Sequence, residues 1–214
     1  MNSIYTKASA YEHAMRPRET LPELLRSAAD GETRLLVQFG GQGAGFLSEI
    51  QRLYVEREGM RDFFEVGIDA VSDAAHRADV LESPYYEHGF ELRSWLRGGP
   101  LPPVAYLQHC NISFPLTILA QLAHVYALEQ AGQVGPVGHP GQSGLPLAQF
   151  IRELEDDGSM VTGHSQGIFA AAAFGLGHSG DAFLQAVYDF THWFAIAGFH
   201  VMALYPESAP KVPE

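Results

Sequence analysis

The chain has 214 residues, 46% of them apolar, which is enough to bury the core of one globular domain. Its net charge of −12 argues against nucleic acid and anionic membrane surfaces as partners, because both are themselves negatively charged. The single cysteine, Cys110, rules out an intrachain disulfide, and the N-terminus has no apolar signal core, so a cytoplasmic location is expected. No apolar run is judged long enough to span a bilayer, so no membrane is expected.

The first part of the chain predicts a leading segment, a strand and a helix. Residues 1–33 are mixed and polar and lead into the core, with a short helix predicted at 22–29. The mostly apolar run 34–39 predicts a buried central strand. The glycine-rich residues 40–43 then predict a loop whose backbone comes close to another group. A helix is predicted at about 46–56.

The middle of the chain is predicted to be helical. Apolar residues at helical spacing indicate a broken helical region over 60–96, which a proline-rich stop at 98–103 ends. Residues 115–132 are the clearest helix, with proline at the start and glycine at the end. This helix is apolar almost all round, so we expect it to be buried. The glycine- and proline-rich residues 133–144 predict an exposed loop.

The last part predicts two helices, a strand and a tail. A surface helix is expected at 147–154. Another helix, with a wide apolar stripe, is expected at 182–197, and Gly198 would end it. Residues 200–205 are predicted to form a strand. The tail at 206–214 would be a linker, so residues 34–205 would form the core.

The stretch 159–173 has the pattern of a nucleophile elbow. A short apolar run enters a Gly-x-Ser-x-Gly pentapeptide at 163–167, and an alanine-rich helix leaves it. A sharp turn would then lift Ser165 above the end of a sheet. The backbone N–H of Gln166, at the helix start, would face the oxyanion that forms when the serine attacks. The alternative is a structural glycine turn with an incidental serine.

Three separate motifs, in this order along the chain, carry a resemblance to a known family. They are residues 38–43 (QFGGQG), 112–116 (ISFPL) and 162–167 (TGHSQG). Together they resemble the acyltransferase domain of type I fatty acid synthases, of the fungal beta-subunit or bacterial type, with malonyl-CoA:acyl-carrier-protein transacylases as more distant relatives. The resemblance covers about 34–213. It implies an α/β fold with a parallel-sheet core and a hydrolase-like elbow, incomplete at the C-terminus.

The resemblance implies acyl transfer from coenzyme A, through an ester on Ser165, to the phosphopantetheine thiol of an acyl carrier protein. The backbone N–H of Gln42 would join that of Gln166 in the oxyanion hole. Acyl-CoA and phosphopantetheine are substrates here, and neither a metal nor a permanently bound cofactor is implied. The expected partners are the carrier protein and the remainder of a fatty acid synthase, or a complementary chain.

The resemblance also exposes a gap around the serine. Related enzymes activate it with a histidine far downstream, after a ferredoxin-like subdomain, and the sequence ends at Glu214 before either. Adjacent residues of an elbow point to different sides, so His164 is expected to pack behind the serine turn without acting as the base. The isolated chain is therefore expected to be inactive or weak.

The sequence favours an uncharged acyl group, acetyl or another starter unit. Malonyl-specific relatives pair the substrate carboxylate with an arginine on the helix after the elbow, whereas no arginine follows Arg152 here. Phe114 also stands where those relatives carry glutamine. Two other functions remain open. One is a catalytically incomplete half-domain that serves in assembly, and the other is a serine esterase with its histidine and acid within 166–214.

Overall fold

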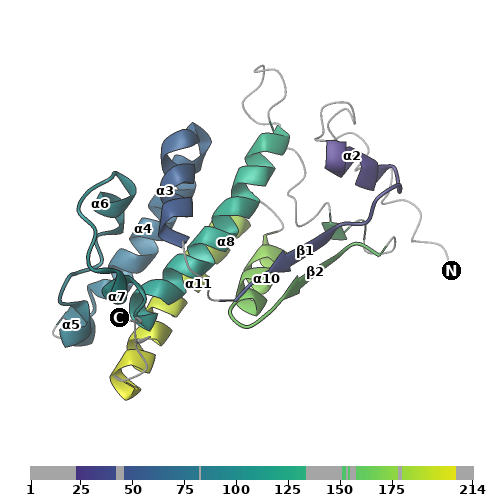
Figure 1. Ribbon diagram of the computed structural model, residues 1–214. Coiled ribbons are helices and arrows are strands. Elements are labelled where there is room, and N and C mark those ends of the chain that lie inside the picture. Colours follow the sequence, from purple (N-terminus) through teal and green to yellow (C-terminus); the bar gives the residue numbers. More distant parts are fainter. Residues whose placement is uncertain are drawn as a thin grey trace.

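The computed structural model describes residues 23–41, 46–81, 83–133, 151–152, 154, 158–177 and 180–205. Helices form one side of the molecule, and a small parallel sheet with its neighbouring helices forms the other (Figure 1). The elements in chain order are α2 (Glu23–Ala29), β1 (Leu36–Phe39), α3 (Phe46–Glu56), η2 (Glu58–Met60), α4 (Arg61–Ala75), α5 (Ala78–Leu81), η3 (Pro84–Tyr86), α6 (Leu92–Leu96), α7 (Val104–Leu107), α8 (Cys110–Gln133), β2 (Met160–Gly163), α10 (Gly167–Leu176) and α11 (Gly180–Leu204).

Helix α8 is the centre of the helical side. It packs mainly against α11, and also against α3, α4 and α10. Its residues are apolar on all sides, so a surface position would leave apolar area in water, and burial removes that area. The largest fully buried side chains lie around it: Phe63 and Phe64 on α4, Trp95 on α6, and Ile112 and Leu116 on α8 itself. The expectation of a buried helix is confirmed.

The same helix corrects the expectation that no apolar run is long enough to span a bilayer. The stretch Cys110–Gln130 has the length and composition of a membrane-crossing helix, with a mean hydropathy of 1.2. However, 72% of its most apolar window is buried inside the protein. Core packing against the neighbouring helices therefore accounts for its apolar character.

Two boundaries differ from the predictions, and close packing explains one of them. Helix α11 runs through Gly198 to Leu204, so both the helix end at Gly198 and the strand at 200–205 are wrong. A Cβ on Gly198 would collide with the Cys110 carbonyl oxygen, so glycine here lets α11 approach α8. Helix α8 begins at Cys110, and Pro115 lies inside it instead of opening it.

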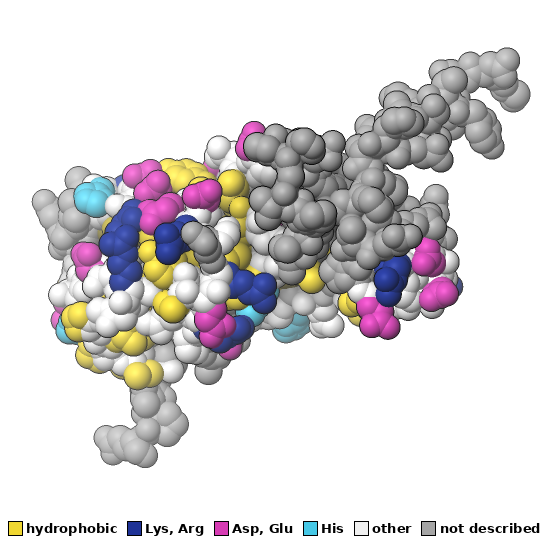
Figure 2. Space-filling model, turned by 90° about the horizontal axis from the view of Figure 1, so that it is seen from above, with side chains coloured by type: hydrophobic (Ala, Val, Ile, Leu, Met, Phe, Trp, Pro, Cys, Tyr) yellow, Lys and Arg dark blue, Asp and Glu magenta, His cyan; other side chains and the backbone are white. Residues whose placement is uncertain are grey.

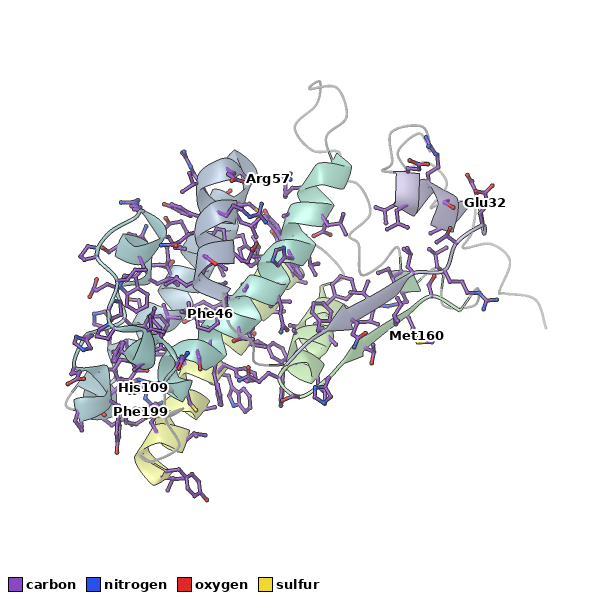
Figure 3. The ribbon with its side chains drawn as sticks, viewed as in Figure 1. Glu32, Phe46, Arg57, His109, Met160 and Phe199 are labelled. Carbon is purple, nitrogen blue, oxygen red and sulfur yellow. The ribbon has the colours of Figure 1, made fainter. Side chains whose placement is uncertain are left out.

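The sheet has one covered face and one open face. Strands β1 and β2 are parallel, with Leu36 opposite Met160. Because side chains alternate along a strand, Val37, Phe39 and Val161 face the core, whereas Leu36 and Met160 are 59% and 54% exposed. Figure 3 shows Met160 on the side away from the helices. The prediction of a buried central strand is wrong for this face, and among the described residues β1 pairs only with β2.

Charged side chains on the helical side are mixed in sign. Figure 2 shows acidic and basic groups interspersed over the described surface of that side. On α3, Arg52 pairs with Glu49 and Glu56 at 2.9 and 3.3 Å. Exposed pairs of this kind contribute little to stability. They do place positive charge next to negative charge on this surface.

Several predictions fall outside the described residues. They include the loop at 133–144 except its first residue, the tail at 206–214 and most of the segment 1–33 and of the helix at 147–154. The helices at 22–29 and 46–56 are confirmed as α2 and α3. The fold is thus mostly helical with a small parallel sheet, which is consistent with an α/β acyltransferase-type domain.

Candidate active site

Ser165 lies in the turn that joins the end of β2 to the start of α10. Its φ is +55°, and it is the one non-glycine residue with positive φ in the described part of the chain. This left-handed conformation costs an L-residue about 1–2 kcal/mol. Two hydrogen bonds hold the turn: Gly167 N–H donates to the His164 carbonyl at 2.9 Å, and Ile168 N–H donates to the Ser165 carbonyl at 3.1 Å. Ser165 is exposed at the carboxyl end of the strands.

The two glycines of the pentapeptide allow helix, turn and strand to meet. A Cβ on Gly163 would collide with the Gly167 carbonyl, and a Cβ on Gly167 would collide with the Phe39 and Gly40 carbonyls. Any other residue at these positions would push α10 away from the strands. The N-terminus of α10 is consequently held against the end of β1.

The loop after β1 passes directly beside the serine. A Cβ built on Gly41 would lie 3.0 Å from Ser165 Cβ and 3.5 Å from Ser165 Oγ. The sequence predicted that this glycine-rich loop brings its backbone close to another group, and Ser165 is that group. Gln42 itself lies outside the described residues.

Gln166 is the N-cap residue of α10, and its side chain is buried, with 8% exposure. Neither its side-chain nitrogen nor its oxygen has a hydrogen-bond partner among the described residues. Its backbone N–H lies where the helix dipole is positive, which favours a developing negative charge. The turn can therefore present a nucleophile and an oxyanion donor in consecutive residues.

No histidine is hydrogen-bonded to the Ser165 side chain within the described ranges. His164 precedes the serine and is exposed. His192 stacks on Tyr188 with a centroid separation of 5.7 Å, and His200 packs on the Phe199 ring at 5.4 Å. His178 lies outside the described residues. In that part of the chain no group of three potential metal ligands comes together either.

Aromatic side chains of α8, α10 and α11 form a cluster, and its member on α10 follows Ser165 by four residues in the sequence. Phe169 on α10 contacts Trp193 and Phe194 on α11, with ring centroids 5.3 and 5.0 Å apart, and Phe114 on α8 lies 6.2 Å from Phe194. Phe169 and Trp193 remain 38% and 50% exposed. The sequence analysis did not single out Phe169. Its place in the first turn of α10, directly after the serine turn, was the available signal.

Among the described residues, no arginine or lysine is paired with a group at these rings. Arg152, the last arginine of the chain, donates to the Gly175 carbonyl at 2.8 Å, near the far end of α10. Because Phe169 and Trp193 are partly exposed, the preference for an uncharged acyl group stays a prediction.

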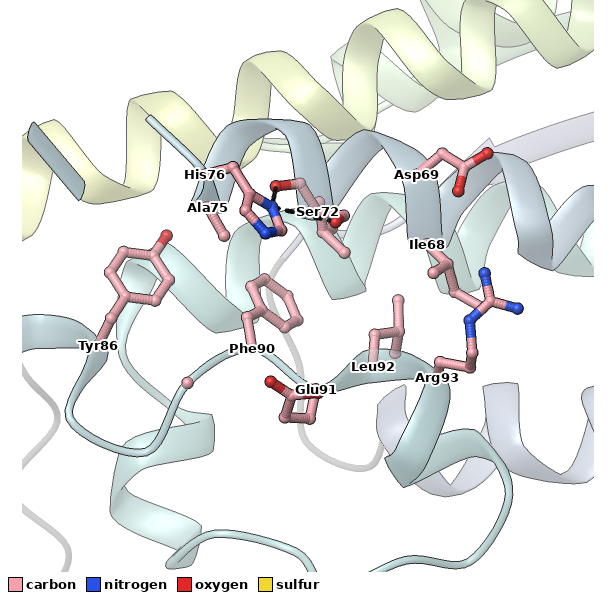
Figure 4. A pocket seen from close by; sticks show the side chains of 12 residues that line it. Ile68, Asp69, Ser72, Ala75, His76, Tyr86, Phe90, Glu91, Leu92 and Arg93 are labelled. Atoms are coloured by element: carbon pink, nitrogen blue, oxygen red, sulfur yellow. Dashed lines mark hydrogen bonds between the residues drawn. The ribbon is translucent and has the colours of Figure 1, made fainter. Parts of the chain in front are cut away.

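A cavity of about 370 Å³ lies away from the serine turn, between α4 and the segment from η3 to α6 (Figure 4). Its polar side chains are satisfied close by: His76 Nδ1 lies 3.2 Å from Ser72 Oγ, and Arg93 pairs with Glu65. Burial raises the pKa of Tyr86 on its wall to about 12, so that phenol stays neutral. None of these groups belongs to the serine turn.

Comparison with known proteins identifies the family. The family model described as "Starter unit:ACP transacylase in aflatoxin biosynthesis" matches residues 37–211. The chain belongs to the starter unit:ACP transacylase family. The matched region of the chain begins in β1 and contains the serine turn and the aromatic cluster.

The chain is also similar to fungal fatty acid synthase subunits. It is 33% identical over 164 residues to the fatty acid synthase subunit beta of Gibberella zeae, and these residues make up 74% of this chain and 7% of the relative. Identity to the fatty acid synthase beta subunit hexB of Dothistroma septosporum is 32% over 173 residues, 76% of this chain and 8% of the relative. Identity to fatty acid synthase 2 of Mycosarcoma maydis is 31% over 174 residues, 78% of this chain and 4% of the relative. The chain thus spans less than a tenth of the length of each.

Proposed function

We propose that this chain transfers an uncharged acyl group from coenzyme A to the phosphopantetheine thiol of an acyl carrier protein, through an ester on Ser165. The observation that supports this most is the backbone of Ser165, with φ at +55° between a parallel strand and a helix N-terminus. A strained serine in that position is typical of a nucleophile elbow. Membership of an acyl-transferring family agrees with it.

The proposed reaction has two half-reactions through tetrahedral intermediates. Ser165 Oγ attacks the thioester carbonyl carbon, its proton goes to a general base, and the coenzyme A thiol leaves after protonation. The carrier thiol then gives its proton to the base and attacks the serine ester, and the base returns that proton to Ser165 Oγ as the serine leaves. In both steps the backbone N–H groups of Gln166 and Gln42 would donate to the oxyanion. The base would be a histidine that is not among the described residues, and His164 is not expected to serve.

The proposed acyl group is acetyl-like because the rings on α10 and α11 that follow the serine turn are apolar. The rings of Phe169, Trp193 and Phe194 offer apolar contact, and no arginine follows Arg152. Transfer of malonyl would need a cation for the free carboxylate, since burying it unpaired is costly. The proposal therefore predicts discrimination in favour of the neutral substrate.

The proposed context is a cytoplasmic synthase. Residues 34–205 would be the first part of an acyltransferase core and 206–214 a linker. The carrier protein and the rest of a fatty acid synthase, or a complementary chain, would be partners, as the names of the fungal relatives suggest. The proposal needs no metal and no permanently bound cofactor, because acyl-CoA and phosphopantetheine enter as substrates.

Intact-mass analysis after incubation with acetyl-CoA tests the proposal. We expect an acetyl adduct that is lost in Ser165→Ala, and a much slower adduct from malonyl-CoA. If the chain alone forms no adduct, the assay is repeated with the C-terminal portion of a related acyltransferase domain added to supply the histidine. An adduct that persists in Ser165→Ala, or none under either condition, would contradict the proposal.

The open face of the sheet favours a second candidate, an assembly module. Leu36 and Met160 lie side by side on this face and are more than half exposed. Parallel sheets are normally covered on both faces, so this one suits contact with another chain. Light scattering combined with the mass assay distinguishes the two functions. An oligomer of the chain that forms no acetyl adduct would favour assembly, and a monomer that forms the adduct would favour the enzyme alone.

A further inference from the structure

Gln121 extends from the central helix to the loop beside the serine. Its Nε2 donates to the Gly40 carbonyl oxygen at 2.7 Å, across 81 positions of sequence. Gln121 belongs to α8, the most buried helix, whereas Gly40 directly follows β1. This hydrogen bond therefore ties the loop to the rigid helical side of the molecule.

The Gly40 carbonyl lies at the junction of the elements that make the site. Gly167, at the start of α10, packs so closely on this carbonyl that a Cβ would collide with it. The next residue, Gly41, lies against Ser165. Because the peptide group is planar and trans, fixing the direction of the Gly40 C=O also fixes the Gly41 N–H, which points the opposite way.

The chemistry of Gln121 argues against a purely structural residue. Its Oε1 is buried and has no hydrogen-bond partner among the described residues. A buried unpaired acceptor costs about 1–3 kcal/mol, so folding alone would favour leucine or methionine here. The neighbours Leu119, Ala120, Leu122 and Ala123 are all apolar and buried. The carboxamide is kept for what its N–H does, and the described contact of that N–H is Gly40.

We propose that Gln121 is a positioning residue for Ser165. Its hydrogen bond holds the Gly40–Gly41 peptide against the serine turn, so that the backbone of this loop keeps a fixed distance from the reacting carbonyl. Gln121 acts through Gly40 and does not touch the serine. The inference rests on the proposed function, because positioning matters only if Ser165 reacts. A misplacement of about 1 Å in such a loop can slow a reaction up to 100-fold.

The test replaces the amide with an apolar side chain of similar length. Gln121→Met removes the donor, and Gln130→Met makes the same change on the same helix at a distance from the serine, beside Gly59. The rate of acetyl adduct formation is followed against acetyl-CoA concentration, with the complementing C-terminal portion present if it is required. We expect Gln121→Met to lower the maximum rate about tenfold, with less than a twofold change in the half-saturating concentration. Gln130→Met should match the wild type.

A readout that does not depend on catalysis separates the possible failures. In chain labelled with ¹⁵N-glycine, the Gly41 amide resonance should shift in Gln121→Met and stay in place in Gln130→Met. An unshifted Gly41 resonance, or a maximum rate equal to the wild type, would overturn the positioning role. An adduct that persists in Ser165→Ala, or the absence of any adduct, would instead overturn the proposed function, and the Gly41 resonance would still decide the contact.

Discussion

The helical side and the sheet side of the molecule bury their apolar groups to different extents. Around α8, phenylalanine, leucine and isoleucine side chains are fully enclosed by α3, α4 and α11. On the sheet, Leu36 and Met160 form an apolar pair on an open face. The turn that carries Ser165 lies at the end of this less covered side. Stability thus resides mainly in one region and the candidate chemistry in the other, as is common because sites need access and some local freedom.

The largest expected effect comes from emptying the helical core. Phe63 is fully buried, edge-on to Phe64 at 5.3 Å and stacked on Tyr126 at 5.2 Å. Phe63→Ala should lower the free energy of unfolding by about 3–5 kcal/mol, because it removes apolar contacts and leaves a cavity. Urea denaturation followed by circular dichroism measures the loss.

The matched change on the sheet side is Leu36→Ala. Since Leu36 is 59% exposed, its truncation should alter the free energy of unfolding by less than about 0.5 kcal/mol. Equal losses in Phe63→Ala and Leu36→Ala would mean that the sheet face is covered in solution. The contrast between the two regions would then disappear.

An intermediate effect is expected where two helices touch backbone to backbone. Gly198→Ala places a Cβ against the Cys110 carbonyl and should cost about 1–3 kcal/mol, because α11 must move away from α8. Gly175→Ala on α10 is the control, since a Cβ there meets nothing within 4 Å. This control should stabilise by up to about 1 kcal/mol through helix propensity. Thermal unfolding of the two variants checks both signs, and a tolerated Gly198→Ala would disprove the close packing.

A smaller effect than at Gly198 is expected at the serine, with opposite signs for stability and chemistry. Glycine adopts positive φ without strain, so Ser165→Gly should stabilise the fold by about 0.5–1 kcal/mol while it abolishes the acyl adduct. Ser165→Ala keeps the strain and should leave the melting temperature nearly unchanged. Equal melting temperatures for the two variants would show that the turn relaxes in solution.

Local patterns predicted much of the helical side. Periodic apolar residues gave α3 and located α8, because a buried helix needs apolar groups at that spacing. Gly198 was misread because glycine serves two purposes: it ends helices, and it allows close approach of backbones. Only the presence of Cys110 opposite decides between these, and that contact is a tertiary one. Pro115 was misread in the same way, as the start of a helix that in fact continues before it.

In the candidate site, too, local features could be predicted from the sequence and tertiary contacts could not. The pentapeptide around Ser165 is local, so the sequence predicted the strand, the turn and the helix that surround the serine. The proximity of the Gly41 backbone to the serine was foreseen only as an approach to some group. The Gln121–Gly40 bond and the aromatic contacts of Phe169 join segments far apart in the chain. Periodicity and composition carry no information on such contacts.

The left-handed backbone at Ser165 also affects which substitutions this position would accept during evolution. A chain selected only for folding or assembly would gain stability by exchanging this serine for glycine or asparagine, which occupy positive φ at lower cost. Mutation alone would therefore erase the serine once chemistry ceased to matter. Among chains of this family, the residue at the position of Ser165 should sort those that still transfer acyl groups from those that only assemble.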